Sequence, residues 1–155
     1  MSVGADTRVG GAWWATRRGT AAIEFGLFAP LMLILLGGVV ELGNGVFEAM
    51  QVQSAAEAGA LYVAKHGWNA AAISAAVINA TQTIGIEATP APTKFCGCPG
   101  SGAITVTSCT AICSNGSAVG TYVQINATLA NDQILSLSGL VLPTTLTGLA
   151  IVRLN

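Results

Sequence analysis

Residues 17–25 read RRGTAAIEF and stand directly before a long apolar run. Glu24 is the only charged residue between Arg18 and Glu41. On insertion scales a charge at the centre of a membrane helix costs roughly 2.5–3.5 kcal/mol, so a carboxylate in such a segment needs a reason. This cost falls near the end of the helix, and the plainer alternative is that Glu24 sits in the headgroup zone.

The run that follows is long enough to cross a bilayer. At about 1.5 Å per residue, residues 20–40 form a helix of about 31 Å, which matches a hydrocarbon core of roughly 30 Å. Pro30 removes one backbone hydrogen bond, which membrane helices tolerate when neighbouring groups satisfy the freed carbonyl. We therefore predict a transmembrane helix over residues 20–40.

Positive charges are distributed asymmetrically about this span. Arg8, Arg17 and Arg18 precede it, and Lys65 is the first base after it. Because positively charged flanks tend to stay in the cytoplasm, Arg17 and Arg18 predict a cytoplasmic N-terminus and export of everything beyond residue 40.

The composition excludes several classes of protein. Only 8% of the 155 residues are charged and 52% are hydrophobic, whereas ordinary soluble domains are roughly 25% charged. The net charge is −1, and no basic stripe or zinc-finger spacing indicates a nucleic-acid partner. His66, the one histidine, has no nucleophile motif or acid cluster beside it. We therefore expect no enzymatic activity and no cofactor.

The order of arginines, Gly19, Thr20 and Glu24 before an apolar helix resembles the processing site of type IV prepilins. Together with the downstream residues, it is most similar to the TadE-like family, the pseudopilins of the tight-adherence (Flp) pilus machinery. The resemblance implies that prepilin peptidase cuts after Gly19, so that Thr20 begins the mature chain. A glycine before the cut lets the backbone lie extended in a protease groove.

The resemblance also implies a role for Glu24 in assembly, in which its carboxylate pairs with the amine of Thr20 of a neighbouring subunit. Glu24 lies four residues from Thr20, on the same helix face, and such a pair lowers the cost of both charges in lipid. The implied partners are prepilin peptidase, other pilin-like subunits, the pilus assembly platform and membrane lipid. The implied location is the bacterial inner membrane, with a periplasmic or extracellular head.

Two other interpretations of the N-terminus remain open. A secretory signal peptide would place a small-residue cleavage site after the apolar run, but this run is long and continues into a helical pattern. A simple uncleaved anchor explains the length and the arginines, yet leaves Gly19 and Glu24 without a role.

The helical pattern continues beyond the membrane. One face is predicted from apolar and small residues at three- and four-residue steps: Phe47, Met50, Ser54, Ala58 and Leu61. A small-residue patch within residues 55–60 would let another helix or sheet approach closely. Gly43 and Gly45 predict a bend where the helix leaves the bilayer.

A stop and restart of the helix is predicted at residues 66–69. Gly67 suits a left-handed cap, and Asn69 suits the N-cap of a second helix. The apolar face of this second helix is predicted to hold Ile73, Val77, Ala80 and Ile84.

Strands are expected in the last third of the chain, at residues 103–109, 121–129 and 146–154. In the second of these, Val123, Ile125, Ala127 and Leu129 should face inward, and Tyr122, Gln124, Asn126 and Thr128 outward. Asn115-Gly116 predicts a turn. The third strand is apolar on both faces, which predicts a covered or central position, with Arg153 at its exposed end. Residues 122–125 and 151–153 also contribute to the TadE-like resemblance.

Four cysteines lie close together on the exported side: Cys96, Cys98, Cys109 and Cys113. An even, clustered set in an oxidising compartment predicts disulfides. Bridges between the two pairs are favoured, because joining Cys96 to Cys98 would close a very tight ring. The nested arrangement is slightly preferred over the crossed one. A zinc site of four thiolates is the rival interpretation, and neither the spacing nor the export favours it.

The predicted fold is α+β. A cytoplasmic leader (1–19) precedes the transmembrane helix (20–40), which continues into an extracytoplasmic helical stem and a second helix (41–85). A small antiparallel sheet stapled by disulfides forms the head (86–155).

Overall fold

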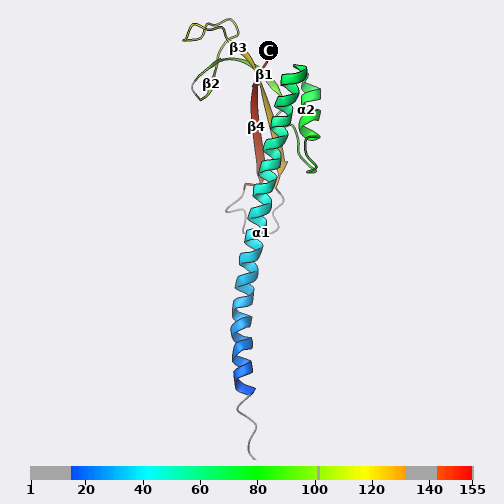
Figure 1. The fold of residues 1–155 in the computed structure, drawn as a ribbon, viewed down its shortest axis with the longest axis vertical. Coiled ribbons are helices and arrows are strands. Elements are labelled where there is room, and N and C mark those ends of the chain that lie inside the picture. The colour runs from blue at the N-terminus through cyan, green and yellow to red at the C-terminus, as the bar shows by residue number, and fades with distance from the viewer. Residues whose placement is uncertain (1–14, 101, 132–142, 155) are drawn as a thin grey trace, which may run out of the picture. The chain divides into compact units, whose positions relative to one another are not determined.

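The computed structural model describes residues 15–100, 102–131 and 143–154, with the side chains of residues 15–18 left aside. Figure 1 shows the elements in chain order. They are α1 (Ala15–His66), α2 (Ala70–Ile78), β1 (Thr93–Pro99), β2 (Ile104–Val106), β3 (Gly120–Ala130) and β4 (Thr145–Arg153). The chain divides into two compact units after Val40.

The first unit contains the N-terminal part of α1, with Pro30 inside the helix. Its apolar side chains are exposed: the exposed fraction is 73% for Ile23, 69% for Leu33 and 70% for Val39. From Gly19 onward, α1 is long and apolar enough to cross a membrane, and its most apolar 18-residue stretch has a mean hydropathy of 2.2. The α1 segment thus fits the predicted anchor in length and composition.

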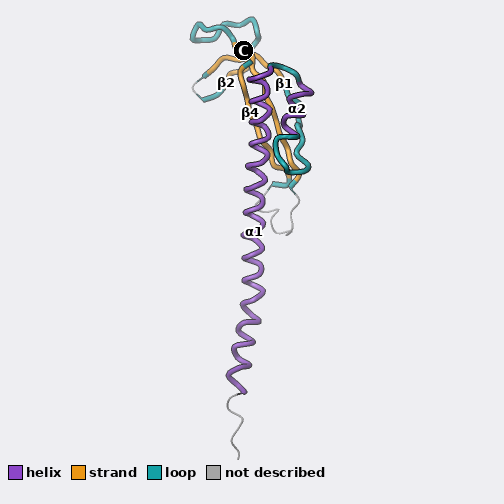
Figure 2. Tube along the Cα trace, turned by 45° about the vertical axis from the view of Figure 1, so that its right-hand side comes forward, coloured by secondary structure: helices purple, strands orange, loops and turns teal. Residues whose placement is uncertain are grey.

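The second unit is built on a four-stranded antiparallel sheet in the order β2-β1-β3-β4. β3 is paired on both sides, with Tyr122 opposite Phe95 of β1 and Val123 opposite Val152 of β4. The tube view places α2 and the C-terminal part of α1 beside this sheet (Figure 2). Helices packed against an antiparallel sheet confirm the predicted α+β class.

The core lies between the helices and the inward face of the sheet. All four β3 side chains predicted to face inward are buried: Val123, Ile125, Ala127 and Leu129. The helices contribute Val52, Ala55, Ala56 and Val63 from α1, and Ile73 and Val77 from α2. Cysteine is not part of this cluster.

The small-residue patch of α1 allows this close packing, as predicted. A Cβ atom on Gly59 would lie 2.8 Å from Cγ2 of Val77 and 2.9 Å from Cγ2 of Ile125. By contrast, Phe47, Met50 and Leu61 are exposed, so the face predicted from them is not the buried one. The side chains of α2 and β3 thus pack directly against the backbone of α1 at Gly59, whereas several larger side chains of α1 lie outside the core.

The junction between the two helices follows the predicted caps. Gly67 has φ of +76°, a conformation that glycine adopts without steric cost. The side chain of Asn69 accepts a hydrogen bond from the backbone N–H of Ala72 at 3.1 Å, which caps α2. However, α2 ends at Ile78, and Ile84 is 95% exposed, so the second helix is shorter than predicted.

Three further features differ from the expectations. β1 was not predicted, because its seven residues include Cys-Gly-Cys-Pro and lack an alternating apolar pattern. β4 is an edge strand rather than a central one, and Leu149 on its outer face is 50% exposed. Tyr122 is buried, because its ring stacks on Phe95 with the ring centroids 5.7 Å apart.

The glycines at the start of the second unit do not interrupt α1, which remains α-helical through Gly43 and Gly45. The Asn115-Gly116 turn forms as predicted, with Gly116 at φ +77°. It lies in the connection between β2 and β3, which are not neighbours because β1 lies between them.

Candidate anchor and assembly site

The residues predicted for processing and assembly lie in α1, within the first unit. Gly19, Thr20 and Glu24 are all helical and exposed. Successive residues of an α-helix are 100° apart, so residues four positions apart face the same side one turn along. Thr20 and Glu24 therefore lie on one face of the helix, as expected.

Glu24 is surrounded in sequence by apolar residues that are themselves exposed. Phe25 is 75% exposed and Leu27 is 74% exposed. Exposed apolar surface of this extent is stable in lipid or against another protein, but not in water. Whichever of these covers the helix also surrounds the Glu24 carboxylate, which then needs a partner of opposite charge or a position among the headgroups.

The predictions that concern the leader are not tested by the structure. Residues 1–14 of the predicted leader lie outside the described residues, as do the side chains of Arg17 and Arg18. Arg17 and Arg18 themselves belong to α1, which begins at Ala15. The cut after Gly19 and the cytoplasmic side of the N-terminus stay predictions.

The second functional feature is the disulfide-bonded end of the head. The bridges join Cys96 to Cys109, with Cα atoms 5.1 Å apart, and Cys98 to Cys113, with Cα atoms 5.6 Å apart. The pairing is therefore crossed, and the nested arrangement preferred from the sequence is wrong. Because all four thiols are in disulfides, the rival zinc interpretation is not supported either.

The register of β1 and β2 explains the crossed pairing. β2 runs antiparallel to β1 with Val106 opposite Gly97, and the N–H of Thr107 donates to the carbonyl of Cys96. Along β2 the chain first lies opposite Cys98, at Thr105, and then reaches Cys96, at Thr107. Cys109 follows directly and therefore lies next to Cys96. The chain then turns back, and Cys113 reaches Cys98.

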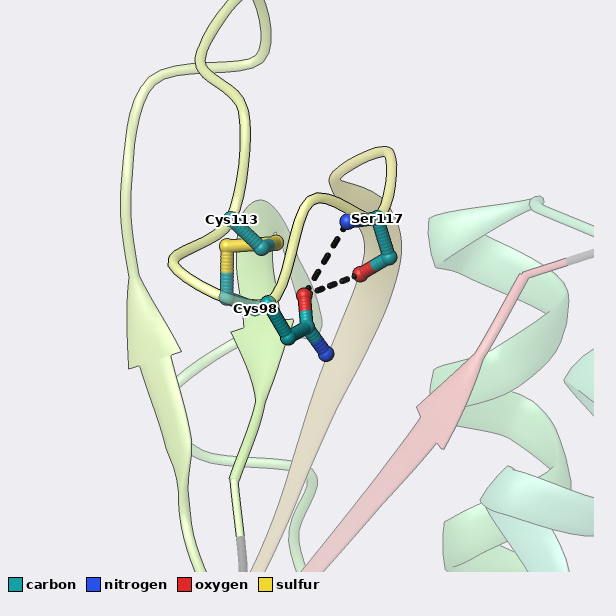
Figure 3. Close-up of a disulfide and its surroundings, with 4 residues drawn as sticks. Cys98, Cys113 and Ser117 are labelled. Carbon is teal, nitrogen blue, oxygen red and sulfur yellow. Dashed lines mark hydrogen bonds between the residues drawn. A yellow bond between two sulfur atoms is a disulfide. The ribbon is translucent and has the colours of Figure 1, made fainter.

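A tight turn holds Cys113 in place (Figure 3). The N–H of Cys113 donates to the carbonyl of Ser117, and the N–H of Gly116 donates to the carbonyl of Cys113. Asn115 accepts two hydrogen bonds from Ser117 through Oδ1, one from the backbone N–H at 3.1 Å and one from the hydroxyl at 2.7 Å.

A third feature was missed from the sequence. The side-chain amide of Gln53 in α1 bonds both backbone groups of Leu149 in β4, accepting from the N–H and donating to the carbonyl, each at 3.2 Å. No local pattern could have indicated this contact, because the two residues are 96 positions apart.

Residues 19–61 match the model of the TadE-like protein family. No curated protein and no solved structure matches the chain. The TadE-like match begins at Gly19 and ends within α1, so it includes Glu24 and the small-residue patch. It confirms the resemblance inferred from these residues, whereas residues 122–125 and 151–153 lie outside it.

The TadE-like match covers the part of the chain in which charge and length predicted an anchor. It supports a pilin-like protein associated with the tight-adherence pilus. Among the described residues, no group of histidine, cysteine, aspartate or glutamate side chains could hold a metal ion.

Proposed function

We propose that this chain is a pilin-like assembly protein of the tight-adherence pilus, a machinery related to type II secretion systems. In this proposal, prepilin peptidase removes residues 1–19 and the mature chain remains anchored in the inner membrane by α1. The head then lies outside the cytoplasm. The protein serves as a minor pilin, an initiator or a tip subunit in cell adhesion, and its role is structural rather than catalytic.

The observation that carries the proposal is the position of Glu24. This carboxylate lies one helical turn from Thr20, on an exposed apolar helix, within the segment that matches the TadE-like family. An isolated acid in lipid is costly, and a new amine on an adjacent subunit would offset that cost. The pair would also fix the axial position of one subunit against the next.

The head supports an extracytoplasmic location. Two disulfides form readily in an oxidising compartment and are rare in the reducing cytoplasm. Their presence beyond the anchor agrees with the orientation predicted from Arg17 and Arg18. The partners in this proposal are prepilin peptidase, other pilin-like subunits, the assembly platform and membrane lipid.

The first test is the mass of the protein purified from its native host. An N-terminus at Thr20 supports processing. A start at Met1 or Ser2 would overturn it and would favour a permanently anchored envelope protein, or an adhesive head on an uncleaved tether.

The second test separates assembly from anchoring. Glu24→Ala should abolish incorporation into pili while leaving the protein in the membrane fraction, because the apolar helix is unchanged. Glu48→Ala is the matched control, since Glu48 is also in α1 but beyond the predicted span. Normal piliation with Glu24→Ala would show that the carboxylate does not have this role.

A further inference from the structure

β4 has one exposed edge. β4 pairs with β3 on one side only, and in the described part of the chain no strand pairs with it on the other. The N–H of Leu154 donates to Thr121 next to β3, so the even-numbered residues of β4 direct their backbone groups toward the sheet. Because direction alternates along a strand, Thr147, Leu149 and Ile151 direct theirs toward the open edge.

One position of this edge is already occupied by an amide. Gln53 makes two hydrogen bonds with Leu149, one to its N–H and one to its carbonyl. A residue of an adjacent antiparallel strand makes the same pair of bonds in a hydrogen-bonded pair. The side chain of Gln53 therefore takes the place that the peptide group of another strand would take.

This occupation is easily reversed. The Gln53 bonds are solvent-exposed, and its Nε2 also donates to Oε1 of Glu57 at 3.2 Å. An exposed side-chain bond contributes little net stability, because water replaces it when it breaks. An incoming strand that offers its own N–H and carbonyl can displace Gln53 without leaving Leu149 unpaired.

The surface next to the edge is a groove between α1 and β4. Its α1 side includes Glu57, Ala60 and Leu61, and its β4 side includes Leu149 and Ile151. Leu61 is 63% exposed, and Ile151 is 43% exposed. Among the described residues, Glu57 is the only charged one that lines the groove. The groove thus offers apolar contacts with one negative charge beside an open row of backbone groups.

We infer that this groove binds an extended strand of a partner polypeptide, which adds to the sheet along β4. Strand addition takes its affinity from main-chain hydrogen bonds and its specificity from the pockets for alternate side chains. Here the occupant has apolar side chains at alternate positions and a lysine or arginine that reaches Glu57. The inference rests on the second unit alone and does not depend on the role of Glu24.

The occupant is a strand of a different polypeptide. It is defined by apolar side chains at alternate positions and by a basic side chain that complements Glu57.

The experiment uses the full chain in lipid nanodiscs and a labelled nine-residue peptide of sequence TLTGLAIVR as the probe. This sequence has the required apolar character and a terminal arginine, and as a free peptide it carries no anchor. Fluorescence anisotropy should show saturable binding. A peptide with the same side chains but N-methylated at alternate residues should bind at least fivefold more weakly, because it lacks the edge donors.

Two variants test the edge from the protein side. Gln53→Ala removes the competing amide and should tighten binding by about fivefold. Ile151→Pro removes an N–H that points to the open edge and not to β3, and edge strands tolerate proline there; it should weaken binding at least fivefold. Ile84→Val is the control, because Ile84 is exposed in the segment after α2 and does not line the groove; it should bind as the unsubstituted chain does.

Several results would overturn the inference. They are absence of saturable binding, equal binding of the N-methylated peptide, and unchanged binding to Ile151→Pro when circular dichroism shows the fold retained. Equal binding of a peptide with glutamate in place of its arginine would overturn the choice of a basic occupant. Dimerisation of the Gln53→Ala chain through β4 would show that a second copy is the occupant instead.

Discussion

The backbone of Gly148 in β4 lies directly against the backbone of Val52 in α1. A Cβ atom on Gly148 would be 2.6 Å from the carbonyl oxygen of Val52 and 3.0 Å from the Cα of Gln53. Both neighbours are main-chain atoms of a helix, so neither can rotate away. Contact between helix and sheet at this point therefore requires a residue without a side chain.

Gly148→Ala should accordingly destabilise the head by about 1–3 kcal/mol, the usual cost of forcing extra volume into a packed interior. Urea denaturation of the full chain in detergent micelles measures this. Gly43→Ala is the control, because its Cβ would meet nothing within 4 Å in α1 and alanine favours helix by roughly 0.5–1 kcal/mol. Equal stability of Gly148→Ala and the unsubstituted chain would contradict this packing.

The N-cap of α2 gives a second prediction. Asn69→Ala removes the side-chain acceptor for the N–H of Ala72, and loss of such a cap costs about 1 kcal/mol. Hydrogen exchange at the amides of α2 should become faster by several-fold. Asn69→Asp keeps an acceptor and should exchange as the unsubstituted chain does; similar acceleration in both variants would argue against the cap.

The crossed disulfide pairing gives a third prediction, which thiol counting can check. Removing the partners Cys96 and Cys109 together, each by substitution with serine, should leave Cys98 and Cys113 joined and no free thiol. Substituting Cys96 and Cys113 instead removes one member of each bridge. That variant should show two free thiols under native conditions, whereas the nested arrangement would give the opposite outcome.

Local chemistry explains what could be predicted from the sequence. The cap at Asn69, the turn at Gly116 and the inward face of β3 each depend on residues a few positions apart, and all three are confirmed. The apolar length of α1 also needs no tertiary information. The TadE-like match at residues 19–61 includes Gly19 and Glu24, on which the resemblance was built.

Contacts between distant segments explain what could not be predicted. β1 forms a strand because β2 and β3 pair with it on either side, although its own residues favour a strand only weakly. In the sequence, Gln53 is indistinguishable from any other polar residue on a helix surface, because its two hydrogen bonds to Leu149 depend on the position of β4. The crossed bridges likewise follow from the β1–β2 register, which the spacing of the cysteines does not define.

The head is held together in two different ways at its two ends. Helices and sheet meet through glycine contacts and a cysteine-free aliphatic cluster, whereas the segment from β2 to the Asn115 turn is tied to β1 by the two sulfur bridges. Reduction of the two bridges would therefore loosen the segment from β2 to the Asn115 turn first, and would leave the layer that faces the helices folded. Because disulfides hold this segment in place, its other residues can vary in sequence without destabilising the core between the helices and the sheet.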